Sequence, residues 1–173
     1  DPVILMSGPT CAPFSSLNIG WNYDKMKMSK KAYEMIEDGM RHLAYAVELS
    51  MHQARRGRYF AIEHPATAAS WQTQTINLLR ELPGVAEVEL DFCALGMTSE
   101  DDHGPAPIKK RTRIITNCPE LVRELSKRQC TKDHRHVPLV HGRASAWQQY
   151  PMEFCRAVCR AVAVQADKDE KLG

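Results

Sequence analysis

Residues 3–15 have the sequence Val-Ile-Leu-Met-Ser-Gly-Pro-Thr-Cys-Ala-Pro-Phe-Ser, and the rest of the chain is organised around them. The apolar residues 3–6 have the length and the β-branched start of a buried strand, which Gly8 and Pro9 end. Cys11 follows at the carboxyl end of that strand, where open α/β sheets form ligand crevices and where a thiol can act as a nucleophile. The alternative for this residue is a small buried cysteine in a tight turn.

The remaining sequence alternates between helical and extended patterns. Apolar residues recur every three or four positions over 29–56, which predicts a long helix with Ser29 as its N-cap and Gly57 as its stop. The other expected elements are strands over 58–65, 85–92 and 111–117, helices over 71–82 and 119–128, and a final helix from Pro151 that ends in a charged tail over 167–173. This order predicts an α/β sheet of parallel strands with a terminal antiparallel hairpin, one antiparallel strand at an edge, and C-terminal helices.

Composition narrows the class of protein. The chain has 173 residues, of which 43% are hydrophobic and 25% charged, and its net charge of +2 does not by itself predict a nucleic-acid-binding protein. Its six cysteines do not form the dense framework of a small secreted domain, and no signal peptide precedes them, so we expect thiols in an intracellular, reducing compartment. No apolar run approaches the roughly 20 residues of a membrane helix. The lysines of the polar segment 18–29 and of residues 30–31 suit a solvated surface or a phosphate contact equally well.

Three short motifs have a known family pattern. Residues 8–15 resemble the Gly-Pro-Pro-Cys-Gln-x-Phe-Ser nucleophile motif of cytosine-5 DNA methyltransferases, and residues 63–65 lie where that family has Glu-Asn-Val. Residues 109–113 resemble its Gln-x-Arg-x-Arg motif, with both arginines retained, and residues 143–151 are faintly similar to a later Arg…Gln-x-Phe-Pro element. The chain looks most like methyltransferase-like domains in retrotransposon polyproteins of single-celled algae.

The resemblance implies a fold and a division of the chain. It implies the C-terminal half of a class I methyltransferase sheet, which is Rossmann-like. Residues 1–117 would form the methyltransferase-like core, 118–150 a short irregular insertion and 151–173 the C-terminal helix and tail.

The resemblance also implies a chemistry. Cys11 would be the nucleophile that attacks carbon 6 of cytosine, Glu63 the acid that serves N3, and Arg111 and Arg113 the groups that hold the base. The substrate would be DNA with the target base flipped out of the stack, and the methyl donor would be S-adenosylmethionine.

Several positions depart from the family pattern: Thr10, Ala12, His64, Pro65 and Lys109. The family's Phe-x-Gly-x-Gly turn, which binds S-adenosylmethionine, lies upstream of the cysteine motif, and we expect such an upstream region to be missing here. One interpretation is therefore half of an enzyme that another segment completes, and the other is a non-catalytic structural or docking subunit of a larger assembly. Either way we expect no methylation by this chain alone. We also expect a partner chain or assembly at the strand over 3–6, unless the C-terminal helix covers that strand.

A second cluster has metal-ligand residue types. Cys130, His134 and His136 lie within seven residues, and Cys118 precedes them by one predicted helix. Zinc binds such sets of thiolates and imidazoles, although the spacing fits no common finger signature. The alternative is a surface loop with two solvated histidines. Cys155 and Cys159 are interpreted as buried apolar thiols of the final helix.

Overall fold

The computed structural model describes residues 2–15, 30–138 and 149–172. The chain divides into two compact units: the first comprises Asp1–Glu87 and Arg113–Cys118, and the second Val88–Thr112 and Pro119–Gly173. The segment 18–29, the N-cap Ser29 and residues 143–148 of the later motif lie outside the described residues.

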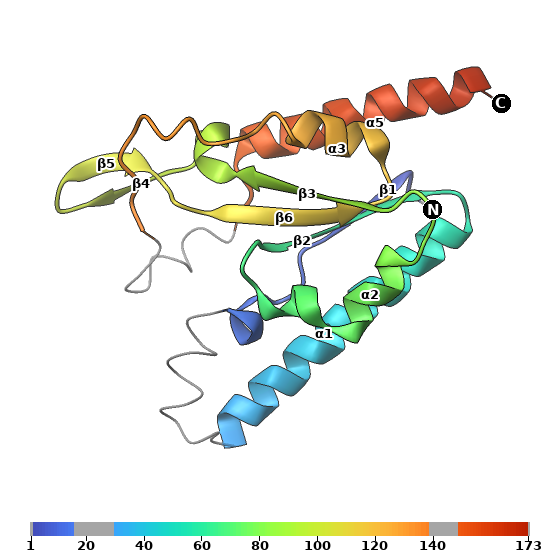
Figure 1. Ribbon diagram of the computed structural model, residues 1–173, viewed down its shortest axis with the longest axis horizontal. Helices are drawn as coiled ribbons and strands as arrows, with labels where there is room; N and C mark the ends of the chain where they lie inside the picture. Colours follow the sequence, from blue (N-terminus) through green and yellow to red (C-terminus); the bar gives the residue numbers. More distant parts are fainter. Residues whose placement is uncertain (1, 16–29, 139–148, 173) are drawn as a thin grey trace. The chain divides into compact units, whose positions relative to one another are not determined.

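The chain folds as an α/β protein with a mixed four-stranded sheet, which confirms the predicted class. The strand order is β1 (Ile4–Ser7), β2 (Tyr59–Pro65), β6 (Arg111–Thr116) and β3 (Ala86–Asp91), and β1 pairs with β2 in parallel (Figure 1). Of the two strands of the expected terminal hairpin, β3 lies at the edge of the sheet, and the last strand, β6, lies between β2 and β3. Ile114 and Ile115 of β6 are fully buried, whereas β3 has exposed or half-exposed glutamates, which suit an edge strand.

The first unit has one core, built by α1 (Lys30–Arg55) against β2. The spacing of apolar residues predicted this helix correctly, and Leu43 and Val47 are buried against Phe60 and Ile62 of β2. The helix predicted over 71–82 is divided into a 3-10 turn, η3 (Ala69–Gln72), and α2 (Gln74–Arg80). Thr73 causes the division, because its side chain accepts the N–H of Ile76 and caps α2.

The cysteine turn is packed against α1. After β1 the chain forms a short 3-10 turn, η1 (Ala12–Phe14), which Cys11 precedes as N-cap residue. Gly39 of α1 faces this turn so closely that a Cβ atom there would lie 2.6 Å from Cγ of Pro13. The glycine therefore allows the close approach of helix and turn.

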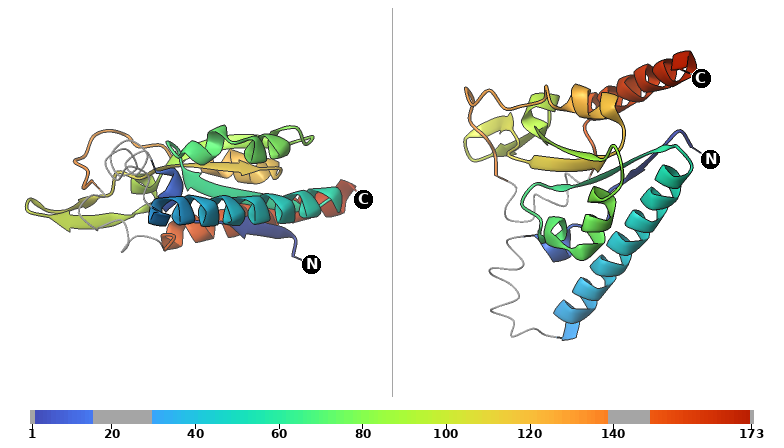
Figure 2. Two further views of the ribbon diagram at one scale, coloured as in Figure 1. Left: turned by 90° about the horizontal axis from the view of Figure 1, so that it is seen from below. Right: turned by 45° about the vertical axis from the view of Figure 1, so that its right-hand side comes forward.

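The second unit combines a hairpin with two helices. The loop expected over 95–107 contains the hairpin of β4 (Thr98–Asp101) and β5 (Gly104–Pro107), which follows the turn η4 (Phe92–Leu95). The helices α3 (Pro119–Leu125) and α5 (Met152–Leu172) lie side by side in each view (Figures 1 and 2). The expected frayed tail is helical to Leu172, and Lys168 pairs with Glu120 of α3 at 2.6 Å.

Aromatic rings fill the core of the second unit. The ring centroid of Phe154 lies 5.4 Å from that of Phe92 and 4.9 Å from that of Tyr150. One and two turns further along α5, Ala157 and Ala161 are buried, while Val164 is 45% exposed. Among the described residues, no helix has the length and apolar character needed to cross a membrane.

Candidate functional site

The register of β1 and β2 brings two of the predicted site residues to the same edge of the sheet. Ser7, the last residue of β1, pairs with Ile62 of β2, and Glu63 follows directly. Cys11 lies four residues after Ser7 and is exposed, whereas Glu63 is only 7% exposed. Cys11 therefore follows the carboxyl end of β1, and Glu63 lies near the carboxyl end of the adjacent parallel strand β2, which is where ligand crevices form in such sheets.

His64 links the carboxyl end of β2 to the turn that carries Cys11. Its Nε2 lies 2.8 Å from the carbonyl oxygen of Pro9, and its Nδ1 lies 2.6 Å from the hydroxyl oxygen of Ser70. A carbonyl can only accept, so Nε2 carries a proton that it donates to Pro9, and in the neutral ring Nδ1 accepts from Ser70. His64 is therefore held at both nitrogens, and it fixes the backbone two residues before Cys11.

The surroundings of His64 favour its neutral form. The ring is 1% exposed, and its centroid lies 5.8 Å from that of Phe14 and 6.1 Å from that of Trp71. Burial lowers the pKa of His64, and the bond to Pro9 and the nearby carboxylate of Glu63 counteract this only in part. Sequence reasoning treated His64 only as a departure from the family asparagine and did not predict this role.

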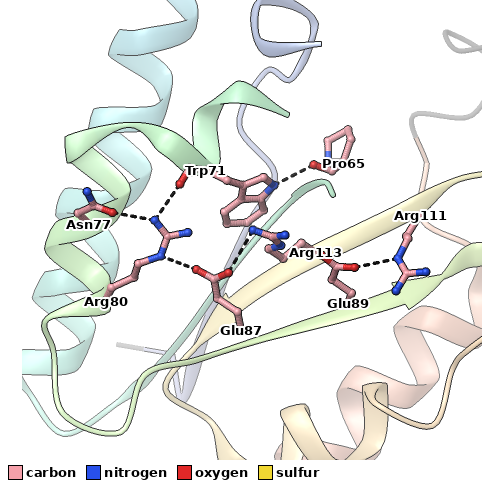
Figure 3. Close-up of polar contacts among 8 residues, drawn as sticks. All are labelled: Pro65, Trp71, Asn77, Arg80, Glu87, Glu89, Arg111 and Arg113. Carbon is pink, nitrogen blue, oxygen red and sulfur yellow. Dashed lines mark hydrogen bonds and ion pairs between the residues drawn. The ribbon is translucent and has the colours of Figure 1, made fainter. Parts of the chain in front are cut away.

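Arg113 of β6 belongs to a network in the first unit (Figure 3). Its guanidinium lies 3.3 Å from Glu87 and 5.4 Å from the ring centroid of Trp71, whose indole N–H donates to the carbonyl of Pro65 at 2.8 Å. Arg80 binds Glu87 at 2.6 Å and also donates to the carbonyl of Trp71. Arg113 thus lies beside the residues that end β2, but its charge is already paired.

Arg111 forms a separate pair in the second unit. Its Nε lies 2.8 Å from a carboxylate oxygen of Glu89, as Figure 3 shows. The arginine side chain is 53% exposed, so solvent screens much of this attraction. Both arginines of the family-like motif therefore have glutamate partners on β3.

A shallow hollow lies between the cysteine turn and α1. It has a volume of about 340 Å³ and is lined by residues 7–10 of the turn and by His42, Tyr45, Ala46 and Leu49 of the helix. The hydroxyl of Thr10, which replaces the family proline, lies 3.1 Å from Nδ1 of His42.

The second unit gathers a group of thiols and imidazoles that could hold a metal ion. The ligand atoms of Cys93, Cys130, His134 and His136 all lie within 4.8 Å of one another. Cys93 belongs to η4, directly after β3, and the other three belong to the segment that follows α3. Asp91 holds that segment in place, because its backbone N–H donates to the carbonyl of Arg128 and its carboxylate accepts the N–H of Cys130.

The structure brings together three of the four predicted metal ligands and adds one that was not predicted. Cys118 is not a member of the group; its side chain is fully buried, and its N–H donates to the hydroxyl of Thr116. Cys93 was missed because it is distant in sequence, although its position directly after a predicted strand was a usable signal. Cys155 and Cys159, expected to be buried, are exposed on α5.

Basic side chains surround this group. A hollow of about 340 Å³ is lined by the four possible ligands together with Asp91, Lys109, Lys110, Arg111 and Lys132. Burial raises the pKa of Cys93 to about 11, with a further contribution from Cys130. Burial, followed by the charges of His134 and Lys109, lowers the pKa of His136. All six cysteines lie in the described residues, and none forms a disulfide.

Comparison with protein-family models, with curated proteins and with solved structures gives no match for this chain.

Proposed function

We propose that this chain carries the nucleophile and base-binding half of a cytosine-5 DNA methyltransferase-like domain. The observation that supports this best is the parallel register of β1 and β2, by which the exposed Cys11 follows the end of β1 and the buried Glu63 lies near the end of the adjacent strand β2. His64 strengthens the proposal, because it holds the backbone that leads to Cys11.

The proposed reaction begins with covalent addition. The thiolate of Cys11 forms a bond to carbon 6 of a flipped-out cytosine, the electron pair of the C5–C6 double bond moves through the ring, and Glu63 supplies a proton at N3. Carbon 5 then becomes nucleophilic and can take a proton from water. Loss of the original hydrogen from carbon 5, expulsion of the thiolate and return of the N3 proton to Glu63 regenerate cytosine, so the net result without a methyl donor is hydrogen exchange.

The described residues do not fit S-adenosylmethionine, the donor that the resemblance implies. Their glycines with positive φ angles are Gly57 and Gly84, which precede β2 and β3, Gly96, which caps η4, and Gly104 in the hairpin. None of these follows the carboxyl end of β1 or β2, where a backbone turn could hold a cofactor. We therefore infer that another segment or chain supplies the site for S-adenosylmethionine.

The second candidate is a non-catalytic docking subunit built on the same fold. The ion pairs favour it, because Arg111 and Arg113 bind Glu89 and Glu87. A base-holding role would require these arginines to exchange a glutamate for the substrate.

Exchange of the hydrogen at carbon 5 of cytosine tests the first candidate, and this measurement needs no methyl donor. Single-stranded and duplex DNA carrying tritium at carbon 5 of cytosine is incubated with the full chain, and tritium release into water is measured. Release above the protein-free rate is expected. It should be lost in Cys11→Ala and reduced in Glu63→Gln, while Cys159→Ala, which removes an exposed thiol of α5, should release tritium at the wild-type rate.

DNA containing 5-azacytosine provides a second measurement, because thiolate addition to that ring gives an adduct that survives denaturation. If the chain releases no tritium and forms no Cys11-dependent adduct, the enzyme proposal is overturned and the docking subunit is favoured. With labelled S-adenosylmethionine the chain alone should transfer no methyl group. The proposal also includes a zinc ion at the Cys/His group, which takes no part in this reaction.

A further inference from the structure

Three of the four possible ligand atoms in the second unit lie close to the spacing of a tetrahedral metal site, and the sulfur of Cys93 lies within 4.8 Å of each of them. Sγ of Cys130 lies 3.6 Å from Nε2 of His134 and 3.4 Å from Nε2 of His136, and the two Nε2 atoms are 3.1 Å apart. Zinc bonds of about 2.3 Å to sulfur and about 2.0–2.1 Å to nitrogen place tetrahedral ligands roughly 3.3–3.8 Å apart. We propose that Cys93, Cys130, His134 and His136 bind one zinc ion in a closed, structural site.

A hydrogen bond to a neighbouring carboxylate orients one of the histidine ligands. Nδ1 of His134 lies 2.9 Å from a carboxylate oxygen of Asp133, which can only accept, so Nδ1 carries the proton and the lone pair of Nε2 faces the other ligands. A carboxylate that orients a histidine in this way is a common partner of zinc ligands. Asp133 is in turn bound by the hydroxyl of Thr131.

The backbone after Cys130 turns a hydrogen-bond donor toward its sulfur. The N–H of Lys132 points to Sγ of Cys130 at 3.3 Å, and Lys132 has a φ angle of 62°, which is unfavourable for a residue with a side chain. Such a conformation persists where the surroundings fix it, and it turns a hydrogen-bond donor toward the sulfur. The basic residues Lys109, Lys110 and Lys132 line the same hollow as the two cysteines.

The ligand set selects zinc over other ions. Two thiolates and two imidazoles in a tetrahedral arrangement are typical of zinc, whereas carboxylate and carbonyl oxygens are the ligands of magnesium and calcium. Four protein ligands leave no position for water or substrate, which indicates a structural ion. The site joins the turn after β3 to the segment 130–136, which has no helix or strand of its own.

Hydrogen bonds from the same segment agree with a structural role. Gln129 donates to the carbonyl of Glu89, and Arg135 binds Asp101 and the carbonyl of Gly104 in the hairpin. Val137 forms an isolated bridge with Ile108. Zinc would fix the part of the segment between these contacts, and this inference is independent of the proposed reaction.

Metal analysis of the full chain tests the proposal. We expect one zinc per chain after purification in zinc-containing buffer, and a lower melting temperature after removal of the metal with a chelator. Cobalt(II) added to the chelator-treated protein should give the intense visible absorption of tetrahedral coordination and the charge-transfer bands of thiolate ligands. Zinc should then displace the cobalt.

Two matched cysteine variants identify the fourth ligand. Cys93→Ala should lose zinc at least tenfold more readily in a chelator titration, whereas Cys118→Ala should keep one zinc per chain. Cys93→Ala also removes a half-buried side chain, so His136→Cys is the second variant: it should retain the metal and show stronger thiolate-to-cobalt bands. Asp133→Asn should weaken zinc binding by roughly 10-fold.

Three results would each overturn the proposal. They are a chain without stoichiometric zinc, a disulfide between Cys93 and Cys130 under reducing conditions, and full zinc retention in Cys93→Ala.

Discussion

Nε2 of His64 lies 2.8 Å from the carbonyl oxygen of Pro9, so a buried imidazole on β2 holds the turn that leads from β1 to Cys11. The opposite ring nitrogen meets the hydroxyl of Ser70, which leaves no nitrogen of this ring for solvent or substrate. The ring is therefore a positioning group, and its contribution depends on its staying neutral.

The buried His64 should make stability depend on pH. Burial lowers its folded-state pKa below the ordinary value of 6.5, so below that pH the unfolded chain binds more protons than the folded chain. The free energy of unfolding should therefore fall as the pH drops from about 7 toward the folded pKa, with a slope of at most about 1.4 kcal/mol per pH unit. Urea unfolding at a series of pH values measures this slope.

The control for this prediction is His64→Gln, which keeps a donor but does not titrate. The variant should be less stable than the wild type at pH 7 and should show a shallower slope below pH 6.5. An unchanged slope would mean that other groups cause the pH dependence.

Gly39→Ala should destabilise the first unit, although alanine is the better helix former. Helix propensity alone favours alanine by about 1 kcal/mol in a helix interior. At this position, however, the new methyl group would lie 2.6 Å from Cγ of Pro13 and 2.9 Å from its Cβ. Overpacking of this kind costs roughly 1–3 kcal/mol, so we expect a net loss of stability. Ala44→Gly, at an exposed position of α1, is the control for propensity; a more stable Gly39→Ala protein would show that the turn can move away.

Arg113→Ala should reduce stability more than Arg111→Ala. Arg113 is 26% exposed and combines an ion pair to Glu87 with a contact to the face of Trp71. Together these contribute about 1–2 kcal/mol, whereas the more exposed pair of Arg111 and Glu89 is screened by solvent and contributes less. Chemical unfolding with and without added salt measures both. Equal losses for the two variants would contradict this ranking.

The sequence predicted the strands and helices with a strong pattern, and it failed where tertiary contacts decide. The spacing of Leu43 and Val47 identified α1, and Gly8-Pro9 identified the end of β1. The place of β6 inside the sheet was not predictable from alternation alone, since it depends on which strand can tolerate an edge. The hairpin of β4 and β5 contains Gly104 and two prolines, a composition that also suits an irregular loop.

The candidate sites show the same division. Neighbouring residues such as Cys130, His134 and His136 suggested a metal site because one short segment carries all three. Cys93 lies in this group because strand pairing and the turn after β3 place it there, and the spacing of neighbouring residues in the sequence does not predict that. Likewise, His64 meets Pro9 only because β1 and β2 are parallel neighbours.

The open edge of β1 leads to the last prediction, that this chain associates through that strand. Within the described parts of the chain, β1 has one strand neighbour, β2, and Val3 is 53% exposed. The carbonyl of Val3 accepts the N–H of Tyr59, so backbone groups of residues 3 and 5 face β2, while those of Ile4 and Met6 face away. Unpaired groups of this kind pair readily with another strand.

Ile4→Pro therefore removes an outward donor and leaves the pairing of β1 with β2 in place, because proline is tolerated on an edge strand whose N–H faces away from the sheet. Light scattering after size exclusion should show a wild-type mass above that of one chain and a shift toward the monomer in Ile4→Pro. Ile4→Val, which changes the side chain but keeps the N–H, should associate like the wild type. A monomeric wild-type chain whose β1 amides are protected from hydrogen exchange would instead mean that another part of the same chain covers the edge.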